Sequence, residues 1–480
     1  MAFSFRFFDA GYNGFPRKER GLRLTLSPPS PARLLILTFM FLIAVGTLML
    51  LQPSCTPDGR PLDLVSAFFT ATSAVCVTGL IVLDTAKDFS AHGQLVILLL
   101  IQLGGLGILT ISNWMWLALR RKASPYDRFL VAQTIGPTSR LHPREVLRRV
   151  FAYTFAFELA GAVLLTARFA FDMPFGRALW FGVFHSVSAF CNAGFSLFSD
   201  SLTGYSGDLL VNGVMMVLIV SGGIGFLVAA DVADAFLSRK RGGFRWRSLS
   251  YQSRVVLLTT GVLLAAGALA FMALEWHNTL ARFRWYQRPL VALFHSVTCR
   301  TAGFNTVDVS ALTNTTLMIT VILMIIGASP GSTGGGIKTT TAAVLWANVF
   351  SRIRGRPRGE MLDRSFASET NSRAVAVTAS YLAIIVVALV LLQHTEFGYA
   401  PHSSLDGGFR FLDHLFEVAS ALGTVGLSTG VTPTLSAAGK MVIIVCMFAG
   451  RVGPLLLAQM LVPRKAPLAY SLPHEKVMIG

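Results

Sequence analysis

Long apolar stretches recur along the 480-residue chain. Each is close to, or longer than, the roughly 20 residues that a helix needs to cross the hydrocarbon core of a bilayer. Eight such stretches can be delimited, at residues 34–51, 92–119, 150–171, 209–235, 255–275, 312–349, 374–392 and 438–462. The pattern predicts eight transmembrane helices in an all-α polytopic membrane protein.

A shorter, partly apolar stretch separates the two members of each consecutive pair. These stretches are too short to span a bilayer but suit re-entrant half-helices. They lie near residues 62–75, 176–190, 288–299 and 408–421. The predicted organisation is therefore helix, half-helix, helix, repeated four times. The repeats are expected over residues 34–119, 150–237, 255–350 and 374–463.

The polar segments between the repeats carry most of the positive charge. They are an N-terminal segment, three loops and a tail, at residues 1–33, 120–149, 238–254, 351–373 and 464–480. Together with residues 451–463, these segments hold 30 of the 41 Lys and Arg residues and eight acidic residues. The segments expected on the opposite side, at residues 52–91, 172–208, 275–311 and 393–440, hold nine basic and 13 acidic residues. The positive-inside rule predicts that both termini and the three loops are cytoplasmic and that the half-helices face outward.

Composition agrees with a membrane protein and limits the alternatives. Charged residues make up 14% of the chain and the mean hydropathy is +0.60, whereas soluble proteins carry about 25% charged residues. A net charge of +17 would suggest nucleic-acid binding in a soluble domain, but membrane topology already explains it. Five widely spaced cysteines without a CxxC pair indicate neither a disulfide framework nor a zinc site. No signal peptide is expected before the first basic cluster.

A short related string follows each predicted half-helix. Each of the four strings contains a glycine, and successive glycines are separated by 115, 109 and 123 residues. Such strings could return outward as extended segments whose carbonyls replace the water shell of a cation, as in potassium filters. Glycine freely adopts the left-handed conformations that aim successive carbonyls the same way. We therefore predict one central pore with a four-part filter for a monovalent cation, formed by Val77, Thr78, Gly79, Asn192, Ala193, Gly194, Thr301, Ala302, Gly303, Thr424, Val425 and Gly426.

A proline and several glycines interrupt the apolar stretch 312–349. Proline breaks helical hydrogen bonding, and unwound backbone within a membrane must line a cavity or be buried in protein. Residues 331–338 resemble a nucleotide-binding Walker A loop. However, Ile337 separates the last glycine from the lysine, so ATP binding here is not expected. An intramembrane loop is predicted over residues 329–341, including Ser329, Pro330, Gly331, Ser332, Thr333, Gly334, Gly335, Gly336 and Lys338.

These segments together resemble the Trk/Ktr/HKT superfamily of potassium transporters over nearly the whole chain. The resemblance rests on CVTGL (76–80), FHSVSAFCNAGF (184–195), FHSVTCRTAGFNTVD (294–308), SPGSTGGGIKTTT (329–341) and GTVGLSTG (423–430). The chain is most similar to the bacterial KtrB-type pore-forming subunit, because it lacks two extra N-terminal spans of Trk-type subunits. The resemblance associates Gly79 in the first filter segment with potassium rather than sodium selectivity.

The resemblance implies a function and an assembly. It implies K⁺ uptake across the bacterial cytoplasmic (inner) membrane by a homodimer in which each chain holds one pore. A cytosolic ring of KtrA/TrkA-like regulatory subunits would bind ATP or ADP, while this chain would need no cofactor. The loop 329–341 would gate the pore, and Arg451 would be a charged barrier beside it. Lys338 could assist in the gate or reach the interface, and Arg451 could instead extend to the cytoplasmic face.

Other chemistry-bearing residues receive plainer interpretations. Cys76, Cys191 and Cys299 precede filter glycines and are expected to pack as small buried side chains. His185 and His295 fall at matching places in two half-helices, where packing is favoured over metal binding. Glu158 could pair with a basic group, and Asp84, Asp88, Asp200 and Asp308 could concentrate cations at the outer mouth.

Two alternatives to a potassium transporter stay open at this point. The first is a sodium-coupled or sodium-conducting member of the same superfamily, and dependence on Na⁺ is not decided. The second is a polytopic membrane enzyme. An enzyme would need an intramembrane acid, base or metal cluster, which the sequence does not indicate.

Overall fold

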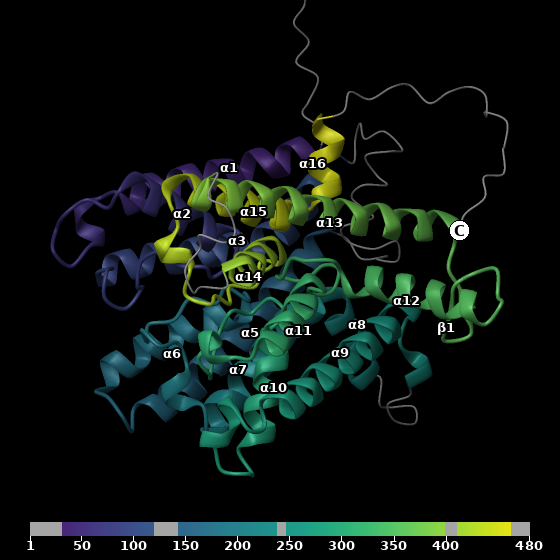
Figure 1. Cartoon of the computed structure of the whole chain (residues 1–480), viewed down its shortest axis with the longest axis horizontal. Coiled ribbons are helices and arrows are strands. Elements are labelled where there is room, and N and C mark those ends of the chain that lie inside the picture. The colour runs from purple at the N-terminus through teal and green to yellow at the C-terminus, as the bar shows by residue number, and fades with distance from the viewer. Residues whose placement is uncertain (1–30, 120–142, 238–245, 399–409, 462–480) are drawn as a thin grey trace, which may run out of the picture.

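The computed structural model describes residues 31–119, 143–237, 246–398 and 410–461, which are mostly helical (Figure 1). The predicted tail, nearly all of the N-terminal segment, residues 120–142 of the first predicted cytoplasmic loop and residues 238–245 of the second lie outside the described residues. The described part confirms the predicted helical class.

The first helix of each predicted repeat contains an apolar stretch long enough to cross a membrane. These four helices are α1 (Pro31–Leu50), α5 (Pro143–Phe169), α9 (Tyr251–Glu275) and α13 (Ser368–Phe397). Large apolar side chains are exposed on them, such as Phe41 on α1 and Val386 on α13. Exposed apolar faces of this extent are expected where the solvent is lipid.

A shorter helix follows each long one, close to the range predicted for a half-helix. The four are α2 (Leu64–Val75), α6 (Phe175–Phe190), α10 (Arg288–Thr298) and α14 (Arg410–Gly423). Asp63 caps α2 by accepting the N–H of Ser66 at 3.1 Å, and a proline occupies the first turn of α10. One phenylalanine at a matched position in each helix is fully buried: Phe69, Phe184, Phe294 and Phe416. Each ring anchors its half-helix in the apolar core.

The second helix of three repeats is interrupted. Helix α3 (Ala91–Leu119) is continuous, but α7 (Leu209–Ile224) and α8 (Phe226–Leu237) meet at a bend of 106°. Gly225 at this bend has a φ of +92°, and Gly453 has a φ of +97° between α15 (Ala437–Val452) and α16 (Pro454–Leu461). Neither break was predicted: the stretches 209–235 and 438–462 are not single helices, because a left-handed residue ends the helical hydrogen bonding.

In the third repeat the interruption is longer, and it overlaps the loop predicted at residues 329–341, although residues 339–341 already belong to the next helix. Helix α11 (Asn314–Ile325) and α12 (Thr339–Ile353) are separated by residues 326–338, which we call the intramembrane loop. After α12 the chain forms a hairpin of two short strands, β1 (Glu360–Met361) and β2 (Arg364–Ser365). The sequence did not indicate this hairpin, because its turn residues Leu362 and Asp363 adopt positive φ without a glycine.

The four repeats close into a ring. The second helix of each repeat packs on the half-helix of the next: α3 on α6, α7 on α10, α11 on α14, and α15 back on α2. In Figure 1 the purple N-terminal helices and the yellow C-terminal helices accordingly lie on the same side of the molecule. The ends of the half-helices therefore converge on a common axis.

Candidate functional site

Four short segments, one after each half-helix, share a backbone conformation that is rare for their residue types. We call them filter segments 1 to 4. In every segment the first residue and the glycine two positions later have positive φ. The φ values are +54° and +90° for Val77 and Gly79, +61° and +72° for Asn192 and Gly194, +71° and +78° for Thr301 and Gly303, and +50° and +94° for Thr424 and Gly426. Left-handed valine and threonine are strained, so the surrounding structure imposes this alternation. Alternating backbone of this kind turns successive carbonyls toward one side.

The glycines of the filter segments form a closed ring. A Cβ built on Gly79 would lie 2.4 Å from the carbonyl oxygen of Ala193 in segment 2. The same construction meets the middle carbonyl of the next segment in every case: 2.9 Å from Gly194 to Ala302, 2.6 Å from Gly303 to Val425, and 2.2 Å from Gly426 to Thr78. The order runs through the four repeats and returns to the first. Backbone and carbonyl oxygens occupy the positions that side chains at these glycines would need.

A hydroxyl group near the end of each half-helix holds the following segment. Ser73 Oγ accepts the N–H of Gly79 at 3.1 Å and donates to the carbonyl of Leu80 at 2.7 Å. The equivalent bonds are Ser188 to Phe195 at 2.8 Å, Thr298 to Phe304 at 2.6 Å, and Gly426 N–H to Ser420 at 3.0 Å. Thr298 stands five residues before its glycine, whereas the other three hydroxyl residues stand six residues before theirs. These bonds preorganise the ring.

The intramembrane loop is built as a short paired stem and a tip. In the stem, Gly327 N–H donates to the carbonyl of Ile337 at 3.0 Å, and Ala328 N–H donates to that of Gly335 at 3.2 Å. The tip contacts the second repeat, where Thr333 N–H donates to the carbonyl of Gly222 on α7 at 3.2 Å. The unwound backbone is thus hydrogen-bonded within the protein, as a membrane interior requires.

The loop lies directly against the first residues of the filter segments. Gly335 N–H donates to Oγ1 of Thr424 at 3.0 Å, and a Cβ on Gly334 would lie 2.1 Å from Oγ1 of Thr301. On the second repeat, Thr333 Oγ1 donates to the carbonyl of Phe190 at 3.3 Å, two residues before filter segment 2. The loop therefore covers the end of the ring opposite to the glycines.

Two cations bind carbonyls of the loop. Arg451 on α15 is buried, and its guanidinium donates to the carbonyl of Thr333 and, at 2.7 Å, to that of Gly104 on α3. Lys338 Nζ donates to the carbonyl of Gly334 at 2.7 Å. Both side chains thus contact the loop.

Comparison with known proteins identifies the family. A sequence model of the family TrkH, described as "Cation transport protein", matches residues 28–465. The chain belongs to the TrkH family. This places it among transport proteins rather than enzymes.

Named relatives of this TrkH-family chain match nearly its full length. It is 37% identical to "Ktr system potassium uptake protein B" of Bacillus subtilis, over 89% of this chain and 92% of that protein. It is 35% identical to the protein of that name from Vibrio alginolyticus, over 93% of this chain and 94% of the relative. It is 34% identical to "Potassium/sodium uptake protein NtpJ" of Enterococcus hirae, over 94% of this chain and 97% of the relative.

A solved structure shares the fold. The crystal structure of the potassium transporter TrkH from Vibrio parahaemolyticus aligns with a TM-score of 0.68 and 20% sequence identity. The alignment covers 92% of this chain and 87% of that one. The helical repeats and their arrangement are therefore those of a TrkH-family, multi-pass membrane protein.

A polar cavity lies on the glycine side of the ring in this TrkH-family chain. It has a volume of about 160 Å³, and all four filter glycines line it together with Asp84 and Asp200. Asp88 lies beside it and accepts the N–H of Asp84 at 2.7 Å, whereas Asp308 caps a short helical turn by accepting the N–H of Ser310 at 3.0 Å. Asp84 and Asp200 are thus the two predicted outer acids that line this cavity.

Two charged residues near the filter segments were not singled out from the sequence. Arg300 immediately precedes Thr301, is 8% exposed, and donates from Nη2 to the carbonyl of Gly327 at 3.1 Å. Glu417 on α14 is fully buried and accepts the hydroxyls of Ser428 and Thr432, each at 2.5 Å. Arg300 lies within the string 294–308 on which the resemblance rests, whereas Glu417 lies outside the quoted strings. Glu417 matches the position of His185 in repeat 2, where His185 contacts Ser196 at 3.0 Å.

The remaining candidates, Cys76, Cys191, Cys299, His185, His295 and Glu158, are buried side chains. No group of His, Cys, Asp and Glu that could hold a metal ion occurs within the described residues. All five cysteines are free and buried. Glu158 on α5 accepts hydrogen bonds from the Gln102 amide at 3.2 Å and from the Cys191 thiol at 3.9 Å, and neither is the basic group considered from the sequence.

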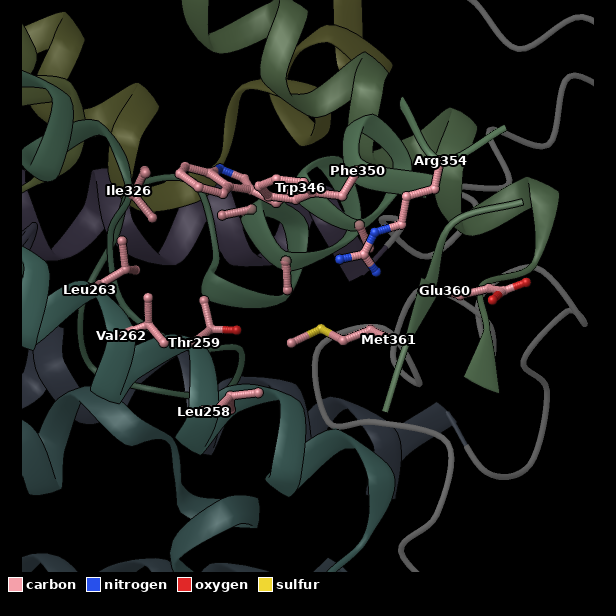
Figure 2. Close-up of a pocket in the computed structure, with 13 residues that line it drawn as sticks. Leu258, Thr259, Val262, Leu263, Ile326, Trp346, Phe350, Arg354, Glu360 and Met361 are labelled. Carbon is pink, nitrogen blue, oxygen red and sulfur yellow. The ribbon is translucent and has the colours of Figure 1, made fainter. Parts of the chain in front are cut away.

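An apolar cavity adjoins the loop from the other side. It has a volume of about 370 Å³ and lies between α9 and α12, with Ile326 at the end near the loop (Figure 2). Leu258, Val262 and Trp346 contribute much of its lining, and Arg354 lies at its opposite end beside the hairpin. This space is next to the loop but separate from the ring of carbonyls.

Proposed function

We propose that the chain is the pore-forming subunit of a bacterial potassium-uptake system. The observation that carries this proposal is the closed ring of four filter segments, whose middle carbonyls face the glycines of the neighbouring segments. A ring of carbonyl oxygens held by half-helix hydroxyls suits a dehydrated monovalent cation. The names of the Ktr-system relatives, with 35–37% identity over most of the chain, support K⁺ as that cation.

The proposed ion path runs from the outer cavity through the ring to the intramembrane loop. Asp84 and Asp200 raise the local cation concentration at the mouth. The twelve filter residues, from Val77-Thr78-Gly79 to Thr424-Val425-Gly426, replace the water shell. Ser329 to Lys338 then form the gate, with Arg451 as its charged latch. Displacement of the loop from Thr301 and Thr424 would open the path inward.

The proposed assembly follows the charge distribution and the relatives. With eight membrane spans and four half-helices, the charge distribution would put both termini and the basic loops in the cytoplasm. The protein would sit in the inner membrane as a homodimer on a cytosolic ring of regulatory subunits that bind ATP or ADP. The relatives named as components of a Ktr system support such partners.

Sodium transport is the second candidate function. It is favoured by one observation, the 34% identity to a protein named as a potassium/sodium uptake protein. Gly79 in filter segment 1 favours potassium. The two candidates differ in whether Na⁺ is carried, is required, or is excluded.

A complementation experiment tests the proposal. The chain is expressed in a bacterium lacking potassium uptake, with and without a Ktr-type regulatory subunit, and growth at micromolar to millimolar K⁺ and Rb⁺ uptake are measured. We expect rescue and Rb⁺ uptake that K⁺ competes better than Na⁺. Absence of rescue in both backgrounds would refute potassium uptake, and equal competition by Na⁺ would favour the second candidate.

A matched pair of variants ties the result to the ring. Gly194→Asp and Gly59→Asp place the same side chain at left-handed glycines, with φ of +72° and +66°. Only Gly194 faces filter atoms, since nothing lies within 4 Å of a Cβ on Gly59. Loss of Rb⁺ uptake in the first variant alone is the expected result.

A further inference from the structure

Arg300 connects a filter segment to the stem of the loop. It is the residue immediately before Thr301, the left-handed first residue of segment 3. Its guanidinium donates to the carbonyl of Gly327 at 3.1 Å, at the base of the intramembrane loop. One side chain thus spans the short distance between the two parts of the proposed ion path.

Comparison of the four repeats shows that a charged residue at this position is specific to repeat 3. The residues at the same place in the other three repeats are Cys76, Cys191 and Gly423, which are uncharged. An arginine occurs here only in the repeat that also contains the loop. Arg451 departs from the repeat in the same way, because Gly105 and Gly223 stand at its equivalent positions. Both departures donate to loop carbonyls, Arg300 at the stem and Arg451 at the tip.

The surroundings of Arg300 do not suit a purely structural ion pair. Arg300 is buried. Within the described residues it forms no salt bridge with an Asp or Glu, and its Nε has no hydrogen-bond partner. A buried charge in a membrane protein is costly and marks function more often than stability. Here its bond to a single carbonyl would be lost whenever the loop stem moves.

We propose that Arg300 is a second latch of the gate and couples it to filter segment 3. Arg300 holds the stem of the closed loop, while its backbone continues directly into Thr301. Loss of its contact with Gly327 therefore frees the loop and relaxes segment 3 together. Arg451 holds the tip from α15 and has no such backbone connection to a filter segment. This inference rests on the proposed function.

The test compares three substitutions in proteoliposomes containing the full chain, with Rb⁺ flux and its competition by Na⁺ as readouts. Arg300→Met keeps the length of the side chain but removes its donors. We expect a rise in flux of about threefold or more and a measurable loss of preference for Rb⁺ over Na⁺. Arg300→Lys retains a donor and should stay close to the parent in both readouts. Arg451→Met should raise flux but leave the preference unchanged.

Controls separate a latch from general destabilisation. Arg288→Met removes an arginine from the outer end of the same helix, where it bonds to Phe283 and lies 4.4 Å from the ring centre of Trp276. It should alter neither readout. Since Arg300→Met could fold poorly, the same comparison is made in a chain shortened over residues 332–337, where Arg300→Lys and Arg300→Met should no longer differ in flux.

The outcomes distinguish the inference from the proposed function. Failure of the parent chain to carry Rb⁺ would reject the proposed function itself. A parent that carries Rb⁺ while Arg300→Met matches it in flux and preference would overturn the inference alone. Equal effects of Lys and Met at position 300 would also overturn it, because they would indicate a requirement for shape rather than for a donor.

Discussion

Arg451 and Thr333 lie 118 residues apart in the chain, and the guanidinium of the first donates to the backbone carbonyl of the second. The same guanidinium binds the carbonyl of Gly104 at 2.7 Å, so it connects the loop tip to α3 as well as to its own helix. The contact uses a backbone acceptor, which any residue at position 333 would supply. The arginine is therefore the specific member of the pair.

Arg451→Gln is expected to open the gate in the absence of a regulatory subunit. Hydrogen bonds to charged groups contribute about 1.5–3 kcal/mol, so their loss should shift the balance from closed to open by roughly tenfold or more. Rb⁺ efflux from proteoliposomes measures the change. The control is Arg373→Gln, which removes the same charge at an exposed pair with Glu369 on α13. Equal efflux from the parent and Arg451→Gln would contradict the latch.

Gly79→Ser is expected to weaken discrimination against Na⁺. The φ of +90° disfavours any side chain, and the new Cβ would approach the carbonyl oxygen of Ala193 to 2.4 Å. The ring must then widen or lose the aim of one carbonyl, which should reduce the K⁺ to Na⁺ preference by about tenfold, or about 1.4 kcal/mol. Competition of Rb⁺ uptake by each cation measures it. Gly59→Ser, at φ +66° with open space, is the matched control. An unchanged preference in Gly79→Ser would remove this residue from the filter.

The four half-helices could be predicted from the sequence because two independent patterns coincide there. Each stretch is too short to span a membrane, and each is followed by a related string with a glycine. The breaks at Gly225 and Gly453 could not be predicted in the same way. Gly222, Gly223 and Gly225 equally suit close helix packing, and all three contact the loop of the third repeat, so only the φ of +92° distinguishes Gly225. A Cβ there would lie 2.5 Å from the carbonyl of Pro330.

The missed residues show the limit of sorting charges by segment. Arg300 belongs to a stretch assigned to the outer side, and its side chain instead reaches under the filter to Gly327. Its direction depends on how α10 is set against the loop, which is a property of the folded repeats. The role of Glu417 also depends on the folded repeat. Its carboxylate accepts hydrogen bonds from Ser428, Thr429 and Thr432, which follow the filter segment.

Glu417→Gln is expected to weaken ion capture at the outer side. Its carboxylate accepts the hydroxyls of Ser428 and Thr432 and the N–H of Thr429, and Ser428 lines the outer cavity. An amide offers one acceptor oxygen where the carboxylate has two, so the stretch after filter segment 4 should loosen. The KM for Rb⁺ should rise by about three- to tenfold with a smaller change in maximal rate, because the ring itself keeps its anchor at Ser420.

Glu275→Gln is the matched control for Glu417. Glu275 is also buried and accepts the hydroxyls of Thr313 and Thr316, at 3.0 and 2.6 Å, but it holds the start of α11 rather than the filter. Both variants should lose thermal stability, by about 1–3 kcal/mol, while only Glu417→Gln raises the KM. A rise of equal size in both would assign the effect to general destabilisation.

Ala343→Phe is expected to hold the gate closed. Protein interiors are close-packed, so a loop that leaves the filter must move into existing space. The cavity of about 370 Å³ beside Ile326 supplies such space, and Ala343 on α12 lines it (Figure 2). A phenylalanine there should lower Rb⁺ flux several-fold without lowering thermal stability, and it should have no effect once residues 332–337 are removed.

Ala388→Phe is the matched control. It enters a different apolar cavity, of about 590 Å³ between α13 and α15, and should leave flux unchanged. If both variants reduce flux alike, or if the shortened loop does not abolish the effect of Ala343→Phe, the loop does not move into this cavity.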